Sequence, residues 1–298
     1  MYGLFCYSDP HNIDISKWDV SNVTDMGEMF YRCEHFNCDL SKWDVSNVKS
    51  IRDMFFECYE FKSDLSKWNV SNVVDMFGAF SNCKKFNSDL SKWDVSNATN
   101  MSRMFATCPK FNADLSEWNI SNVTKTYEMF FNCKAFNADL SRWDVSNVTD
   151  MSHMFYSCGK FNCDVSNWDV SKVKNMAGLF FNCKSFTSDV SNWNVSNVEN
   201  MHSVFLGCIL FNSDLSRWDV SKATNMIWMF YGCENFNSDL SNWDVSNVVE
   251  MEAMFANCKS FNSDLSKWRV SNVEDMNSSL FKNCKSMKEL PAWFNMWK

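Results

Sequence analysis

The stretch FNSDLSKW occupies Phe86–Trp93, and the same eight letters return at Phe261–Trp268. A fixed period between about 20 and 50 residues indicates a solenoid, a propeller or an array. Each repeat can bury its apolar face only against its neighbours, so eleven copies predict one elongated domain. The final tryptophan of the stretch recurs at one constant spacing, at Trp18, Trp43, Trp68, Trp93, Trp118, Trp143, Trp168, Trp193, Trp218, Trp243 and Trp268.

The predicted solenoid is a single domain over residues 1–298. It begins with an incomplete first coil over residues 1–11, in which Leu4 and Phe5 take the Met-Phe positions of the repeat and His11 takes a Phe position. Eleven repeats follow over about 12–286, and a cap that includes Trp297 is predicted over about 287–298. The predicted stack therefore starts halfway through a repeat, which leaves its first coil uncapped.

Two periods alternate within each repeat. The apolar residues of Trp43–Val45 alternate with a polar one, which indicates a strand. Met101, Met104, Phe105 and Cys108 follow the spacing i, i+3, i+4, i+7, which is typical of one face of a short helix. Each repeat is predicted to form a strand, a turn, a short helix and a return loop, and stacking would place the strands in a parallel sheet.

The units WDVSNVTDM at Trp18–Met26, MFYSCGKF at Met154–Phe161 and FNSDLSKW resemble the BspA-like leucine-rich repeat family. This 25-residue repeat, of unknown function, is abundant in mycoplasma surface lipoproteins. The resemblance implies a leucine-rich-repeat-like right-handed coil with a parallel β-sheet on one face and short helices on the other. It also implies surface display with adhesion or protein contacts, and it carries over no catalytic or ligand-binding residue.

Composition and charge exclude several classes of partner. The chain is 46% hydrophobic and 21% charged, as folded soluble proteins are. A net charge of −8 without clustered Lys and Arg argues against nucleic acid. No apolar run approaches the roughly 20 residues of a membrane span, and no signal segment is recognised. These features predict an intracellular or particle-associated protein, whereas the resembling family is often on the cell surface, so both locations stay open.

The fourteen cysteines invite a disulfide or metal interpretation. A column with the period of the repeat runs from Cys33 to Cys258, on the apolar face beside Met and Phe, and the chain has no C-x-x-C pair. We therefore predict buried free thiols and no metal site. Cys38 and Cys163 replace the Ser or Ala of other repeats, so a Cys33–Cys38 or Cys158–Cys163 bridge stays open as the alternative.

An unbroken column of aspartates runs from Asp14 to Asp264. Like charges stacked about 5 Å apart repel one another unless something compensates them. Either each carboxylate accepts backbone N–H groups of its own turn, beside the Ser of the D-L-S motif, or the column holds a row of calcium ions. The turn interpretation is favoured, because calcium-binding solenoids need glycines for their tight turns and this chain has seven.

The four histidines, His11, His35, His153 and His202, are scattered and belong to no recurring His-Cys or Ser-His-Asp arrangement. A hydrolase needs a cleft that holds nucleophile, base and oxyanion donors together, and regular coils offer grooves and faces instead. The sequence therefore predicts a protein without enzymatic activity, without catalytic residues and without a cofactor.

Two consecutive coils depart from the pattern of the repeat. There, apolar residues stand at outward positions that are usually polar, and we predict that they form one convex apolar patch unless loops partly cover them. Such patches mark contact sites, and Trp and Tyr are favoured anchors. The predicted patch consists of Leu206, Ile209, Leu210, Ile227, Trp228 and Tyr231.

Three functional hypotheses follow. The leading one is a non-enzymatic protein-binding or scaffold solenoid, of the surface-display or adhesion type by family resemblance, with a protein partner whose identity is not encoded in the repeat. The alternative is a structural component of a particle or virion, packing as a homo-oligomer through the uncapped N-terminal coil at Leu4 and Phe5. The weakest is an ion-binding rod that uses the aspartate column.

Overall fold

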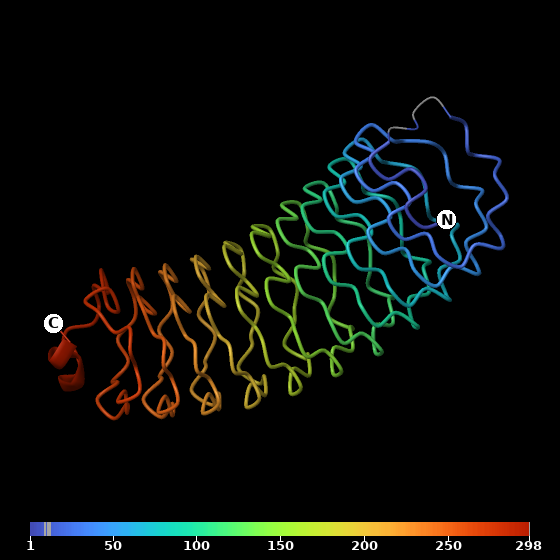
Figure 1. The fold of residues 1–298 in the computed structure, drawn as a ribbon. Coiled ribbons are helices and arrows are strands. Elements are labelled where there is room, and N and C mark those ends of the chain that lie inside the picture. Colours follow the sequence, from blue (N-terminus) through green and yellow to red (C-terminus); the bar gives the residue numbers. More distant parts are fainter. Residues whose placement is uncertain (9, 11–12, 298) are drawn as a thin grey trace. The chain divides into compact units, whose positions relative to one another are not determined.

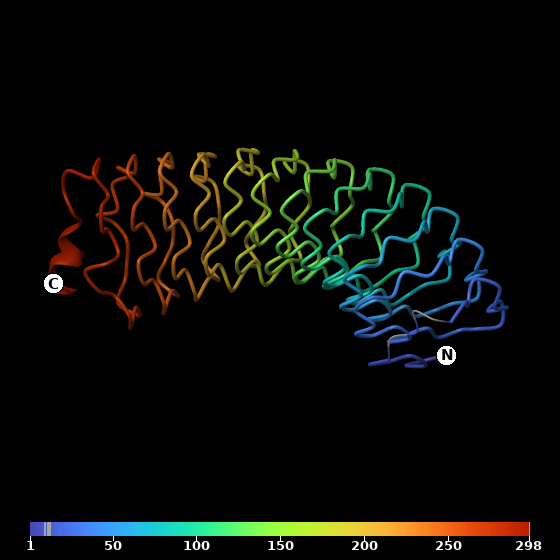
Figure 2. The same cartoon turned by 90° about the horizontal axis from the view of Figure 1, so that it is seen from above.

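The computed structural model describes residues 1–8, 10 and 13–297, with the side chains of residues 296 and 297 left out. The predicted positions of His11 in the first coil and of the Trp297 side chain in the cap lie outside this description. The chain divides into two compact units, Met1–Asn147 and Val148–Lys298. Within each unit, successive coils lie side by side (Figures 1 and 2).

The Met-Phe segment of each coil, here called the turn face, is a run of turns and not the predicted short helix. In unit 1, the N–H of Met104 donates to the carbonyl of Met101 in the same coil (3.2 Å). The next N–H, that of Phe105, donates to the carbonyl of Met129 in the following coil (3.0 Å). This alternation continues along the turn face, so half of its N–H groups join neighbouring coils. The helix prediction is therefore wrong.

Left-handed backbone at two positions of every coil but the last produces this alternation. Arg103 has a φ of 59° and Thr107 a φ of 58°, and a right-handed helix cannot pass through either residue. Gly78 takes the Arg103 position one coil earlier, with a φ of 59°, where glycine adopts this conformation without steric cost. A helix of two turns is only marginally stable by itself. In the stack, every second N–H of the turn face donates to a carbonyl in the next coil.

Parallel pairing is confined to isolated bridges at the residue before the Met column, such as Asp25 with Ser50 in unit 1 and Asp150 with Asn175 in unit 2. Over the described residues 13–297 no strand forms, so the predicted parallel sheet at the Trp-Asp-Val step is absent. Within the part of the chain that the structure describes, the one helical element is the 3-10 helix η1, Ala292–Trp297 (Figure 1).

Side chains supply the links between coils where the sheet was expected. The indole Nε1 of Trp68 donates to the carbonyl of Leu40 in the preceding coil (2.9 Å). The hydroxyl of Ser63 accepts the N–H of the same Leu40 (3.0 Å), and the amide Nδ2 of Asn72 donates to the carbonyl of Ser46 (2.7 Å). Turns at both ends of the Trp-Asp-Val step leave too few residues there for a ladder of backbone hydrogen bonds. The recurring Trp, Ser and Asn side chains link the coils instead.

Stacked aromatic rings fill the core of each unit. In unit 1 the ring of Phe105 lies 5.7 Å from that of Phe80 and 5.8 Å from that of Phe130, centre to centre. Within its own coil it lies 3.9 Å from the ring of Phe111. Burial of each such ring contributes about 2 kcal/mol, so the columns supply most of the driving force for stacking.

Unit 2 ends in a cap. Trp293 continues the tryptophan column, with its ring 6.4 Å from that of Trp268 and its Nε1 donating to the carbonyl of Leu265 (2.8 Å). Phe294 packs edge-on against Phe281 and is 2% exposed. The apolar end of the last coil is therefore covered by η1.

Candidate interaction surfaces

The aspartate column forms turns. The Oδ1 atom of Asp114 accepts the N–H of Ser116 at 2.9 Å, and these bonds hold the pKa of Asp114 below its ordinary value of 3.8. The same bond confirms the turn interpretation along the column, at Asp14, Asp39, Asp64, Asp89, Asp139, Asp164, Asp189, Asp214, Asp239 and Asp264. No group of three or more His, Cys, Asp or Glu side chains suited to a metal occurs among the described residues.

The lowered pKa values of these aspartates predict that the folded protein loses stability in acid. The ionised carboxylate is favoured in the folded state, so its contribution to stability is complete above about pH 5 and is lost as the pH falls through the folded pKa, below 3.8. We expect the melting temperature, followed by circular dichroism, to drop below about pH 4. Each of these Asp–Ser hydrogen bonds lies within one turn, so about 0.5 M salt should not remove the drop in melting temperature. The same salt would screen repulsion between stacked carboxylates. A level profile down to pH 2 would contradict the turn bonds.

The cysteine column is structural. The Sγ atom of Cys108 donates to the carbonyl of Phe80 in the preceding coil (2.9 Å), and the Sγ of Cys208 donates to Phe180 in the same way in unit 2 (2.9 Å). Burial raises the pKa of Cys108. All fourteen cysteines are free thiols, so neither Cys33–Cys38 nor Cys158–Cys163 is bridged.

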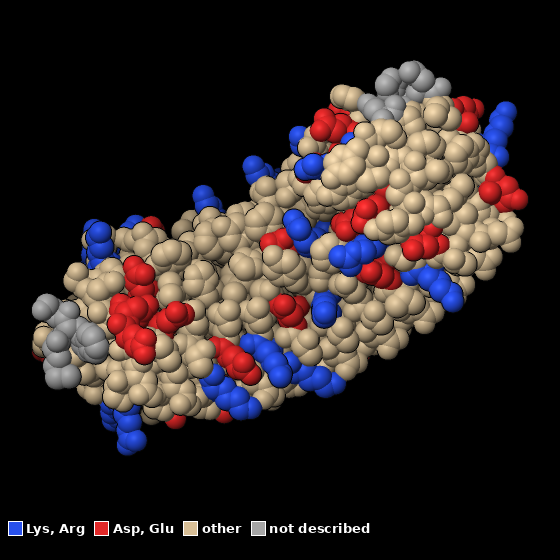
Figure 3. Space-filling view, in the orientation of Figure 1, with Lys and Arg blue, Asp and Glu red and all other residues tan. Residues whose placement is uncertain are grey.

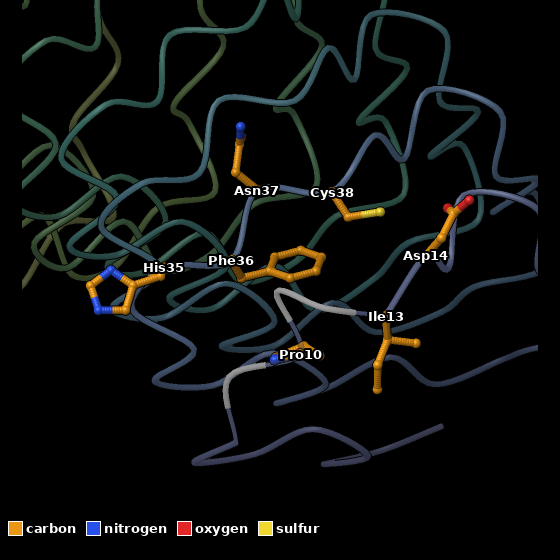
Figure 4. A pocket seen from close by; sticks show the side chains of 7 residues that line it. All are labelled: Pro10, Ile13, Asp14, His35, Phe36, Asn37 and Cys38. Atoms are coloured by element: carbon orange, nitrogen blue, oxygen red, sulfur yellow. The ribbon is translucent and has the colours of Figure 1, made fainter.

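A hollow of about 390 Å³ lies beside the first coils (Figure 4) and is lined by Pro10, Ile13, Asp14, His35, Phe36, Asn37 and Cys38. The imidazole of His35 points away from the side on which Asp14 and the Cys38 thiol lie (Figure 4). These three titratable side chains therefore do not converge on one point, and the described residues that line the hollow offer no arrangement for nucleophilic or metal chemistry.

Polar hollows recur between neighbouring coils. One, of about 410 Å³, is lined by Asp164, Ser166, Ser188, Asp189 and other polar residues of two successive coils in unit 2. Equivalent hollows of about 360 and 460 Å³ lie at the same repeat positions elsewhere. These hollows result from the corner turns, because the carboxylates that line them already accept backbone N–H groups of the chain.

The predicted apolar patch lies in unit 2. Four of its six residues are exposed: Ile209 (38%), Leu210 (46%), Trp228 (37%) and Tyr231 (38%). Leu206 and Ile227 are half-buried. The N–H of Gly207 donates to the carbonyl of Tyr231 (2.8 Å), so the end of the turn face at Leu206 lies against Tyr231 in the next coil. Ile209 and Leu210 follow at the next corner, after the buried Cys208.

Two aromatic residues that the sequence analysis missed extend this surface. Tyr156 and Phe181 stand five residues after the Met column, as Leu206 and Tyr231 do, and their rings stack at 4.0 Å. Both are half-buried. The signal for them was an apolar residue at this column position in seven consecutive coils, from Ala106 to Ala256. Unit 2 therefore carries an apolar stripe, Tyr156, Phe181, Leu206 and Tyr231, that leads to Trp228.

A histidine flanks Trp228. The ring of His202 lies 5.6 Å from that of Trp228, and burial lowers the pKa of His202 below 6.5, with nearby His153 lowering it further. Both histidines are half-buried. The neutral imidazole of His202 keeps the surface around Trp228 weakly polar near pH 7. On the face of the molecule in Figure 3, basic and acidic side chains are interspersed.

The N-terminal coil places Leu4 and Phe5 at an edge of unit 1. Leu4 is 49% exposed, and the half-buried ring of Phe5 stacks on Phe30 at 5.6 Å. Met1, Tyr2, Tyr7 and Ile13 are also exposed, so large apolar side chains gather at this edge. No helix in the described residues is long and apolar enough to cross a bilayer.

Each unit consists of successive coils that are joined by turn-face hydrogen bonds and by side-chain hydrogen bonds around columns of aromatic rings. This arrangement defines each unit as a repeat solenoid. The chain belongs to the family described as "Mycoplasma protein of unknown function, DUF285", which matches residues 1–91, 74–190 and 175–294. This match confirms the resemblance drawn from the repeat units. None of the curated proteins compared with the chain matches it.

Solved structures of leucine-rich repeat proteins are similar to the chain. A leucine-rich repeat protein from Bacteroides ovatus is 17% identical, with a TM-score of 0.49, over 91% of this chain and 71% of its own. A leucine rich cell surface protein from Faecalibacterium prausnitzii is 16% identical, with a TM-score of 0.38, over 90% and 76%. A leucine-rich repeat protein from Eubacterium ventriosum is 15% identical, with a TM-score of 0.38, over 83% and 77%.

Proposed function

We propose that this chain is a non-enzymatic, protein-binding solenoid that docks its partner through the Trp228 patch. This name covers the six predicted residues, Leu206, Ile209, Leu210, Ile227, Trp228 and Tyr231. The observation that carries the proposal is the conformation of Trp228, which is 37% exposed and has a φ of 55°. A surface-display, adhesion or scaffold role belongs to the same proposal and is supported by membership of the family.

The left-handed backbone makes Trp228 costly for the fold. A residue with a side chain loses about 1–2 kcal/mol in this conformation, and a bulky residue there is an outlier. Gly178 takes the same column position two coils earlier, with a φ of 59°. The same left-handed position holds Ser203 and Ala253 in the neighbouring coils, so the turn face does not need a tryptophan. An exposed indole beside exposed Tyr231 is the usual chemistry of a binding anchor.

Replacing Trp228 with glycine is expected to raise the free energy of unfolding by about 0.5–1 kcal/mol, because relief of the left-handed conformation exceeds the entropy cost of glycine. Chemical denaturation measures this change. Ala253→Gly is the matched control, since Ala253 has a φ of 48° at the same column position and carries no indole. If W228G destabilises the protein by about 2 kcal/mol or more, Trp228 is a packing residue and the proposal fails.

Binding is tested with a peptide-display library selected on the full chain. The selected peptides should bind W228G at least about tenfold more weakly than the unsubstituted chain, because anchor tryptophans contribute about 2 kcal/mol or more. They should bind Ala253→Gly normally. Peptides that bind W228G equally well would place the docking surface elsewhere.

The N-terminal edge supports a second candidate function, that of an assembly component such as a particle or virion protein. Its supporting observation is the group of exposed apolar side chains at Met1, Tyr2, Leu4, Tyr7 and Ile13. Light scattering across a concentration series tests assembly between copies. A homo-oligomer would show a mass that rises with concentration and that Leu4→Asp returns to the monomer value.

A further inference from the structure

The turn faces of the two units carry different charges. Counted from the residue before the Met column, the turn faces of unit 1 hold three arginines, and each of them forms an ion pair. The pairs are Arg32 with Glu57 at 2.7 Å, Arg52 with Asp75 at 3.5 Å and Arg103 with Glu128 at 3.0 Å. Five turn faces of unit 2 contain neither Lys nor Arg, at residues 150–157, 175–182, 200–207, 225–232 and 250–257. These five turn faces therefore supply no cation to the carboxylates that they carry.

Two carboxylates of unit 2 lie beside Trp228. The N–H of Trp228 donates to the carbonyl of half-buried Glu252 (2.9 Å), so the two residues touch through their backbones. Exposed Glu250 accepts the amide Nδ2 of Asn225. Burial lowers the pKa of His202, whose ring flanks Trp228, and the charge of Glu250 opposes this shift. Among the described residues, neither glutamate forms an ion pair, and this uncompensated negative charge favours a cationic partner.

Unit 1 shows which group binds to a ring and two carboxylates on a turn face. The guanidinium of Arg52 lies 4.1 Å from the centre of the Phe77 ring. Its Nη1 is 3.5 Å from Asp75, and its Nε is 3.7 Å from Asp53. A guanidinium suits such a site because it stacks flat on a ring while its N–H groups reach carboxylates. Arg52 is therefore an internal example of the chemistry that the tryptophan and the glutamates of unit 2 offer without an arginine of their own.

We propose that the partner of the Trp228 patch is a basic polypeptide segment, whose arginine lies on the ring of Trp228 and pairs with Glu250 and Glu252. An apolar side chain beside that arginine covers Tyr231, which is 38% exposed. Arginine is preferred to lysine, because an ammonium group is a compact, strongly hydrated charge that stacks less readily and cannot form two parallel hydrogen bonds. This choice of partner rests on the proposed function, because the patch must be the docking surface.

The probe is a display library of short random peptides, selected in parallel on the full chain and on E250Q/E252Q. Glutamine keeps an oxygen that accepts the Asn225 amide, so the double variant removes the charges with little change in shape. Peptides selected on the full chain should be enriched in arginine over the input library and over lysine. By fluorescence anisotropy they should bind E250Q/E252Q at least about fivefold more weakly, because two charge-assisted contacts are lost. Selection on E250Q/E252Q should yield no enrichment in arginine.

The matched control combines Glu60→Gln with Glu117→Gln, which removes two carboxylates that already form ion pairs in unit 1. It reduces the net negative charge equally and should change the affinity less than about twofold. Peptides that need Trp228, lack excess arginine and bind E250Q/E252Q normally would overturn the basic partner and leave the proposed function standing. Peptides that bind W228G normally would overturn both. A dimer that W228G dissociates would assign the patch to a second copy and would also overturn the basic partner.

Discussion

Replacing Phe105 with alanine is expected to lower the free energy of unfolding by about 4 kcal/mol, the upper range for loss of a buried aromatic ring. Phe105 is fully buried, and its ring stacks on those of Phe80 and Phe130 and on Phe111 of its own coil. Coils contact only their neighbours, so a cavity in one coil weakens two interfaces at once. Denaturant unfolding followed by tryptophan fluorescence measures the change.

Phe56→Ala is the matched control, because it removes the same ring from the half-buried turn face, where Phe56 stacks on Tyr31 at 4.7 Å. Its cost should be about 1 kcal/mol. Equal losses in the two variants would show that the inner rings do not form a packed core.

The column thiols are expected to react with a soluble thiol reagent about a thousandfold more slowly than a free cysteine thiol. Burial raises the pKa of Cys133 from 9.0 to about 12, and the thiolate is the reactive species. This difference corresponds to a roughly thousandfold smaller thiolate population at pH 8, before any barrier to reagent entry. Mass spectrometry after timed labelling identifies the modified positions.

Cys38 serves as the internal reference, because it is half-exposed and outside the column. It should be labelled first, and the column thiols should react at comparable rates only after denaturation. Labelling of Cys133 at the rate of Cys38 in the folded chain would show that the columns open readily.

Much of the core could be predicted from the sequence alone. A strict period places like residues in register, so Trp118 and Phe105 must meet their counterparts in neighbouring coils. The corner at Asp114 was also predictable, since an aspartate placed two positions before Ser116 forms its turn bond locally. The exposure of Trp228 followed from an apolar residue at an outward position.

The predicted helix failed for a physical reason. The spacing of Met101, Met104, Phe105 and Cys108 puts these side chains on one side of a helix, and it does so equally well in two successive turns. Only the second arrangement frees alternate N–H groups, and these are satisfied by carbonyls of the following coil, as between Phe105 and Met129. A local sequence pattern does not show a hydrogen-bond acceptor that lies a whole coil further along the chain.

The sequence by itself determined the period, the columns that are buried and the residues that break the pattern on the outside. Only the tertiary structure decided how the coils are joined and which carbonyl of the next coil each turn-face N–H meets. The carbonyl of Met129 illustrates the difference, because every residue has a carbonyl and no side chain shows that this one points toward the N–H of Phe105. That direction follows from the left-handed turns, which form when neighbouring coils stack and satisfy them.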